Sequence, residues 1–127
     1  MVMAKTRFYY GCDLLRVIDG DTVDVLADLG FDVSLRLRIR FAGINTPESR
    51  TRNKAEKVLG LAAKARLLEV LEDSDSMEFL SHGRGKFGRV LATPFIVNND
   101  DRTDVCQLLV REGHARLYDG GKREPWV

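Results

Sequence analysis

Apolar and polar residues alternate strictly along Val33–Phe41, and this two-residue period is the clearest pattern in the chain. It predicts a β-strand with one face buried and the other in solvent. Two shorter apolar runs precede it, at residues 15–18 and 21–26, and Asp19-Gly20 between them suits the positive φ of a tight hairpin turn. A second turn is expected at residues 29–32. The first third of the chain therefore predicts three strands that follow one another as a meander.

The spacing of apolar residues becomes helical after residue 52. Asn53 followed by Glu56 resembles a capping box, although asparagine is not the usual Ser or Thr of that motif. The apolar residues then recur at intervals of three or four: Val58, Leu61, Ala62, Ala65, Leu68 and Leu71. We expect a helix from residue 53 to residue 72, which the Asp-Ser repeat at residues 73–76 ends.

The last third of the chain predicts two strands and a short helix. Residues 77–80 and 89–92 are the strands, joined by a glycine-rich loop. Thr103-Asp104 then caps a helix that ends at Gly113. The order is three strands, a helix, two strands and a helix. This α+β, mainly β order is the one expected of a five-stranded Greek-key barrel of the OB type.

Composition narrows the class of protein. The chain has 127 residues, of which 44% are hydrophobic and 31% charged, with a formal net charge of +1. One globular domain over residues 1–127 fits these values, whereas a polybasic nucleic-acid binder does not. Cys12 and Cys106 favour buried free thiols, and His82 and His114 favour surface roles over metal binding. Because there is no long apolar run and no leader-like segment, we expect a cytoplasmic monomer without membrane contact.

Three short clusters hold the residues that could carry chemistry: residues 19–22, 40–48 and 83–89. Phosphodiester hydrolysis needs cations in fixed positions, and the planar guanidinium of arginine binds two phosphate oxygens at once. A divalent cation held by oxygen ligands polarises the phosphoryl group, and a nearby carboxylate acts as general base on water. If the fold brings the clusters together, the residues needed are present: Asp21, Arg40, Asn45, Glu48 and Arg89.

Each cluster also has a plainer interpretation. Residues 19–22 could form only a hairpin turn. Thr46-Pro47-Glu48 is also a good helix start, with Thr as the N-cap and Pro at the first helical position. The arginines at positions 36, 38 and 40 could line a solvated edge strand, and residues 83–89 could form an ordinary flexible loop.

Taken together, the clusters resemble the staphylococcal nuclease family, also called thermonuclease-like. The matched segments are residues 17–23, 40–48, 86–89 and 109–113, in the family's order and at compatible spacings. The resemblance covers most of the chain, from residue 14 to residue 118. It implies an OB-type barrel and a metal-dependent nuclease that cleaves DNA, RNA or both with little base specificity.

The resemblance also implies a set of metal ligands. The carboxylate ligand falls on Asp21, the second side-chain ligand on Asn45 and the backbone carbonyl ligand on Thr46. The general base, which reaches the metal through water, falls on Glu48. The implied cation is calcium, with magnesium or manganese as alternatives.

The remaining implied residues contact the nucleic acid. Arg40 and Arg89 fall on the two arginines that clamp the phosphate and stabilise the transition state. Lys86 and Phe87 match a Lys-Tyr pair at the nucleotide's terminal phosphate, here without the tyrosine hydroxyl. Tyr118 matches an aromatic residue that packs on the base.

Two departures from the family pattern limit the comparison. Asn45 replaces a carboxylate, which removes one negative charge and predicts weaker metal binding or a different divalent ion. The chain is also too short for the family's last helix, and Pro125-Trp126 is expected to pack back on the barrel in its place.

The leading hypothesis is therefore a divalent-metal nuclease. The alternative is a non-catalytic OB module that binds single strands or a protein partner. A purely structural barrel would leave the combination of Arg40, Glu48 and Arg89 without a role.

Overall fold

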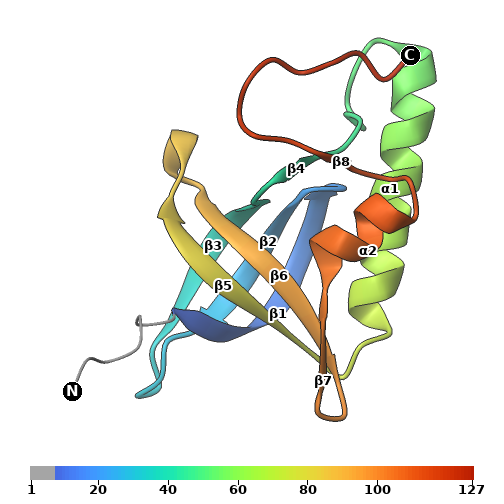
Figure 1. The fold of residues 1–127 in the computed structure, drawn as a ribbon. Helices are drawn as coiled ribbons and strands as arrows, with labels where there is room; N and C mark the ends of the chain where they lie inside the picture. The colour runs from blue at the N-terminus through green and yellow to red at the C-terminus, as the bar shows by residue number, and fades with distance from the viewer. Residues whose placement is uncertain (1–7) are drawn as a thin grey trace.

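Five strands close into a barrel (Figure 1). The computed structural model describes residues 8–127. The N-terminal segment in which we expect no leader sequence includes residues 1–7, which lie outside the described residues. The barrel strands are β1 (Tyr9–Asp19), β2 (Thr22–Asp28), β3 (Ser34–Phe41), β5 (Ser76–Arg84) and β6 (Val90–Asn98). They are ordered β3-β2-β1-β5-β6, and parallel pairing of β3 with β6 closes the ring. The predicted OB-type α+β barrel is confirmed.

The other elements lie at the rim of the barrel or against its side. Helix α1 (Lys54–Glu72) runs along the side, and α2 (Val105–Arg111) follows β7 (Asp101–Asp104), which pairs with β6. Two short strands, β4 (Ile44–Asn45) and β8 (Arg116–Leu117), form a separate sheet, and a single 3₁₀ turn, η1 (Lys86–Gly88), precedes β6. The sequence did not predict β4, β7 or β8. None of the described helices is long and apolar enough to cross a membrane.

The alternation predicted for β3 holds where the strand enters the barrel. Ile39 and Phe41 point inward and are 0% and 1% exposed, while Arg38 points outward and binds Asp24 with Nε 2.8 Å from Oδ1. This pair lowers the pKa of Asp24, mainly through the hydrogen bonds from Arg38. The strand has β2 on one side and β6 on the other, so the solvated edge-strand interpretation is wrong at Arg40.

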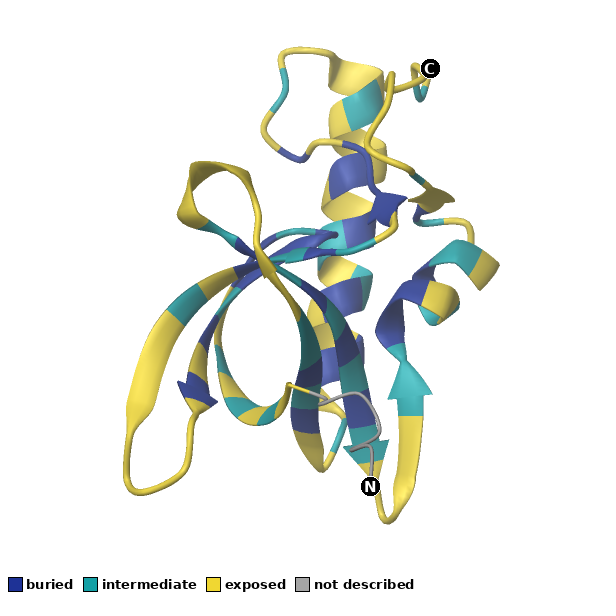
Figure 2. Cartoon of the chain, turned by 60° about the vertical axis from the view of Figure 1, so that its left-hand side comes forward, coloured by how far each residue is buried: buried dark blue, intermediate teal, exposed yellow. Residues whose placement is uncertain are grey.

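Helix α1 forms as predicted, but two details differ. Asn53 caps it by accepting from the backbone N of Glu56 at 3.0 Å, yet the Glu56 carboxylate does not complete a capping box. The predicted stripe also faces solvent over most of its length, since Val58 is 67% and Leu61 47% exposed. Leu71 is the one member of the predicted stripe that is buried, and the other buried residues of the helix are Gly60, Ala63, Leu67 and Val70. The helix carries apolar residues on more than one side, so spacing alone could not select the side that is buried in Figure 2.

The turn between β1 and β2 also differs from the prediction. Its central residues are Gly20 and Asp21, between the paired Asp19 and Thr22, and neither is at positive φ. Gly20 is needed for a different reason. A Cβ there would lie 2.8 Å from the Cβ of Ala63 in α1. The small residue therefore lets the turn approach the helix closely.

The C-terminal segment returns toward the N-terminal end of α1 (Figure 1). The guanidinium carbon of Arg116 lies 3.8 Å from the centre of the Trp126 ring, and its Nη1 donates to the carbonyl of Pro125 at 3.1 Å. Trp126 therefore packs on β8, outside the barrel, and the prediction that it packs on the barrel itself is wrong.

The thiol of Cys106 is expected to make stability fall at alkaline pH. Cys106 is 6% exposed, and burial raises its pKa from 9.0 to about 12. Because the folded pKa exceeds the unfolded value, this contribution is complete below pH 9 and is lost as pH rises toward 12. Urea unfolding at pH 8 and pH 10.5 should show a smaller loss of stability in Cys106→Ala than in the wild type. Equal losses would contradict the expectation.

Candidate functional site

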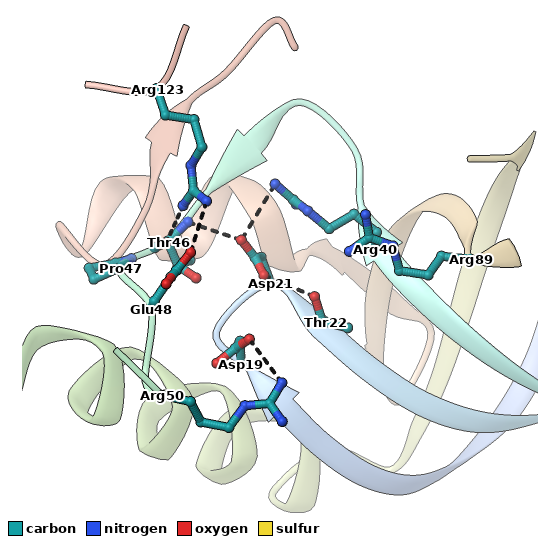
Figure 3. Close-up of a pocket in the computed structure, with 10 residues that line it drawn as sticks. All are labelled: Asp19, Asp21, Thr22, Arg40, Thr46, Pro47, Glu48, Arg50, Arg89 and Arg123. Carbon is teal, nitrogen blue, oxygen red and sulfur yellow. Dashed lines mark hydrogen bonds and ion pairs between the residues drawn. The ribbon is translucent and has the colours of Figure 1, made fainter. Parts of the chain in front are cut away.

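One pocket of about 470 Å³ lies beside the β1–β2 turn, where β3, the loop after β4 and the C-terminal segment meet (Figure 3). Five residues on its wall were predicted from the sequence, and they come from separate segments of the chain: Asp21, Arg40, Thr46, Glu48 and Arg89. The lining residues are Asp19, Asp21, Thr22, Arg40, Thr46, Pro47, Glu48, Arg50, Arg89 and Arg123.

Asp21 sits at the centre of the hydrogen bonding. It is 7% exposed, its Oδ1 accepts from the hydroxyl of Thr22 at 3.0 Å, and its Oδ2 accepts from the backbone N of Thr46 at 3.1 Å. The same Oδ2 lies 3.5 Å from Nη2 of Arg40. The turn at residues 19–22 is therefore both a hairpin turn and the element that fixes a carboxylate in the pocket.

Arg40 is held rigidly at the end of β3. Its Nη1 donates to the carbonyl of Phe41 at 2.7 Å and its Nη2 to the carbonyl of Ile44 at 2.9 Å. The side chain is 18% exposed. A guanidinium has five N–H donors, so these two contacts fix its plane and leave others for an anion in the pocket.

Glu48 lies on a loop that precedes α1. The helix-start interpretation of Thr46-Pro47-Glu48 is wrong, because α1 begins only at Lys54. The backbone N of Glu48 instead donates to Oε2 of Glu56 at 2.9 Å, so the predicted capping glutamate anchors this loop. The side chain of Glu48 is 55% exposed and reaches into the pocket (Figure 3).

Arg89 follows η1 and lines two adjoining pockets. Its Nε donates to the carbonyl of Lys86 at 3.3 Å, and its guanidinium carbon lies 5.7 Å from the centre of the Phe87 ring. The second pocket, of about 660 Å³, also contains Lys86 and Tyr118 on its wall. Phe87 is 91% exposed and lines neither pocket. The predicted nucleotide-contacting residues are thus only partly brought together.

The predicted metal ligands provide oxygen atoms but few charges. Asn45 is 4% exposed and is not on the pocket wall, yet its Oδ1 and the Oγ1 of Thr46 are buried and have no hydrogen-bond partner within residues 8–127. Among residues 8–127, no three Asp, Glu, His or Cys side chains gather in a way that could hold an ion by themselves. The carboxylate of Asp21 and the neighbouring Thr46 provide the kind of oxygen ligands that suit a hard divalent cation, and the neutral amide of Asn45 adds no negative charge to them.

Three charged residues of the pocket, Asp19, Arg50 and Arg123, were not assigned a role in the site from the sequence. The Oδ1 atom of Asp19 accepts two hydrogen bonds from Ser49, one from its hydroxyl and one from its backbone N at 3.4 Å. The Oδ2 atom of Asp19 lies 4.0 Å from Nη2 of Arg50. Asp19 therefore ties the β1–β2 turn to the Glu48 loop. The third is Arg123, which reaches the pocket from the C-terminal segment.

Comparison with known proteins identifies the family of this barrel. The model of a protein family described as staphylococcal nuclease homologues matches residues 38–125. The chain therefore belongs to the staphylococcal nuclease homologue family, with a fold typical of nuclease-like or nucleic-acid-binding proteins. A search of curated proteins found no match. The matched range begins after Asp21. The structure nevertheless places Asp21 in contact with Thr46 and Arg40, two residues that lie inside the matched range.

Proposed function

We propose that this chain is a divalent-metal-dependent nuclease that hydrolyses phosphodiester bonds of DNA, RNA or both with low sequence specificity. The observation that carries the proposal is the juxtaposition of Asp21 and Glu48 with Arg40 and Arg89 in one pocket. Fixed guanidinium groups suit the negative oxygens of a phosphodiester, and a carboxylate opposite them suits the activation of water.

Each residue has a distinct role in this proposal. Arg40 and Arg89 bind the non-bridging phosphate oxygens and stabilise the charge that develops in the transition state. Glu48 takes the proton from the attacking water. Asp21, Asn45 and the carbonyl of Thr46 would hold a calcium, magnesium or manganese ion, which when bound polarises the phosphoryl group. Contacts made to phosphate rather than to base edges account for the low specificity.

The adjoining pocket supplies the rest of the substrate site. Lys86 lies on its wall, where its ammonium group can bind a second phosphate, and Tyr118 offers an aromatic ring for a base. The tyrosine hydroxyl donates to the carbonyl of Gly121 at 2.6 Å, which fixes its position.

A second candidate function is binding of single-stranded nucleic acid without cleavage. Two observations favour it: Asn45 reduces the negative charge available to a cation, and Arg123 already contacts Glu48. Both functions use the same arginines, so they differ only in whether the phosphodiester bond is broken.

A cleavage assay separates the two functions. Purified protein is incubated with single-stranded and duplex DNA and with RNA, in calcium, magnesium, manganese or EDTA. The proposal predicts cleavage of at least one substrate that requires the ion and stops in EDTA. Binding without cleavage in every ion would leave only the second function.

Restoring a carboxylate at position 45 is expected to strengthen ion binding. Asn45→Asp should tighten calcium binding by about tenfold, on the scale by which ligand charge tunes calcium sites. Gln107→Glu, an equal change of charge on the exposed side of α2, is the control and should leave the affinity unchanged. The measurement is isothermal titration calorimetry. An unchanged affinity in Asn45→Asp would show that residue 45 is not a ligand.

A further inference from the structure

Arg123 binds two of the groups that the proposed ion site requires. Its Nη2 donates to the carbonyl of Thr46 at 3.2 Å, and its Nη1 lies 3.4 Å from Oε1 of Glu48 (Figure 3). Thr46 supplies the proposed carbonyl ligand and Glu48 the proposed base. One guanidinium from the C-terminal segment thus takes up both acceptors at once.

We propose that Arg123 is a built-in competitor of the divalent cation, so that its side chain must withdraw from the pocket when the ion binds. The inference rests on the proposed function, because it takes Thr46 and Glu48 to be part of that ion site. A guanidinium and a divalent cation repel each other, and both cannot use the Thr46 carbonyl and the Glu48 carboxylate at the same time. With Asn45 in place of a carboxylate, the ion has a smaller electrostatic advantage over the arginine.

The segment that carries Arg123 is anchored at both ends. Before it, the backbone N of Tyr118 donates to the carbonyl of Gly43 at 2.8 Å. After it, Trp126 stacks on Arg116. Between these anchors lies Gly120, at φ 90, where a side chain would be strained. Arg123 is 43% exposed in its side chain. It can therefore leave the pocket without detachment of the whole segment.

Calorimetric titration of calcium into the full chain tests the competition. Arg123→Gln should tighten calcium binding by about three- to tenfold, the effect of removing one nearby positive charge in screened surroundings. Lys122→Gln is the matched control, because it removes the same charge from the neighbouring residue, which does not line this pocket. Its calcium affinity should stay within about twofold of the wild type.

The single tryptophan of the chain reports on the segment itself. Trp126 lies three residues after Arg123 and has no counterpart elsewhere in the sequence. Calcium should shift the tryptophan emission of the wild type with the same midpoint as the calorimetric titration. In Arg123→Gln the shift should be lost, because no guanidinium group leaves the pocket when the ion binds.

The outcomes separate this inference from the proposed function. Tighter calcium binding in Arg123→Gln with no cleavage of any substrate supports the competition and overturns the nuclease. Ion-dependent cleavage by the wild type with equal or weaker calcium affinity in Arg123→Gln supports the nuclease and overturns the competition. An equal gain in Lys122→Gln, or no calcium binding to either protein, also overturns the competition.

Discussion

Replacing Arg89 with alanine is expected to lower the kcat for nucleic-acid cleavage by about 10³-fold or more. Arg89 lies where the two pockets adjoin, and the described contacts of its side chain are one hydrogen bond to the carbonyl of Lys86 and the Phe87 ring. The substitution therefore removes a proposed phosphate-binding group while leaving the core intact. The midpoint of thermal unfolding should change by less than about 2 °C, as for surface substitutions in general.

Arg84→Ala is the matched control for this prediction. Arg84 is the last residue of β5, just before the loop that carries Arg89, and its side chain also donates one hydrogen bond, to the carbonyl of Gly88 at 2.8 Å, but it does not line either pocket. Its kcat should stay within a few-fold of the wild type. If both variants lost cleavage equally, a disturbed loop rather than a missing phosphate contact would be the explanation. If Arg89→Ala cleaved as fast as the wild type, Arg89 would have no role in the transition state.

The parts of the fold that the sequence predicted are those whose signals are local. The alternation in Val33–Phe41 fixed a strand, and the caps at Asn53 and Asp104 both form, the latter accepting from the backbone N of Gln107 at 3.1 Å. These signals depend on neighbouring residues only. The short strands β4 and β8 carry no such signal, because two residues acquire a strand conformation only by pairing with each other in the folded chain.

The buried face of α1 could not be predicted for a related reason. The exposed stripe that includes Val58 and Leu61 is as periodic as the buried one. Which face packs on the barrel depends on where small residues are needed. Ala63 faces the β1–β2 turn at Gly20, a contact between residues far apart in sequence. Hydrophobic spacing contains no information about that contact.

The candidate site divides in the same way. Asp21, Arg40, Thr46, Glu48 and Arg89 were predicted through the family resemblance, and the structure brings them to one pocket, whereas their chemical roles stay predictions. Arg123 was missed because it is separated from Glu48 by 75 positions and belongs to no motif. Glu56 was assigned to a cap from local spacing, while the structure uses its carboxylate to hold the backbone of Glu48.

Gly60→Ala is expected to destabilise the protein by about 3 kcal/mol, at the upper end of the range for overpacked interiors. Helix propensity alone would make the alanine variant more stable by about 1 kcal/mol. The expected change in stability therefore has the opposite sign to the one that helix propensity predicts. A Cβ at Gly60 would lie 2.3 Å from the carbonyl oxygen of Glu48 and 2.6 Å from the backbone N of Ser49. Both contacts are with backbone, which cannot move aside as a flexible side chain can.

The contact between Gly60 and the Glu48 backbone also links the stability of the protein to the geometry of the candidate site. Because the loop would have to lift away from α1, the Glu48 carboxylate would move with it, and cleavage should fall even at temperatures where Gly60→Ala remains folded. Gly11→Ala is the control, since a Cβ there meets no atom of the described residues within 4 Å, and its stability should match or slightly exceed that of the wild type. The measurements are urea unfolding and the kcat of the folded variants. A Gly60→Ala protein as stable as the wild type would mean that the Glu48 loop does not pack tightly against Gly60, and that the contact with the Glu56 carboxylate is enough to hold the proposed base.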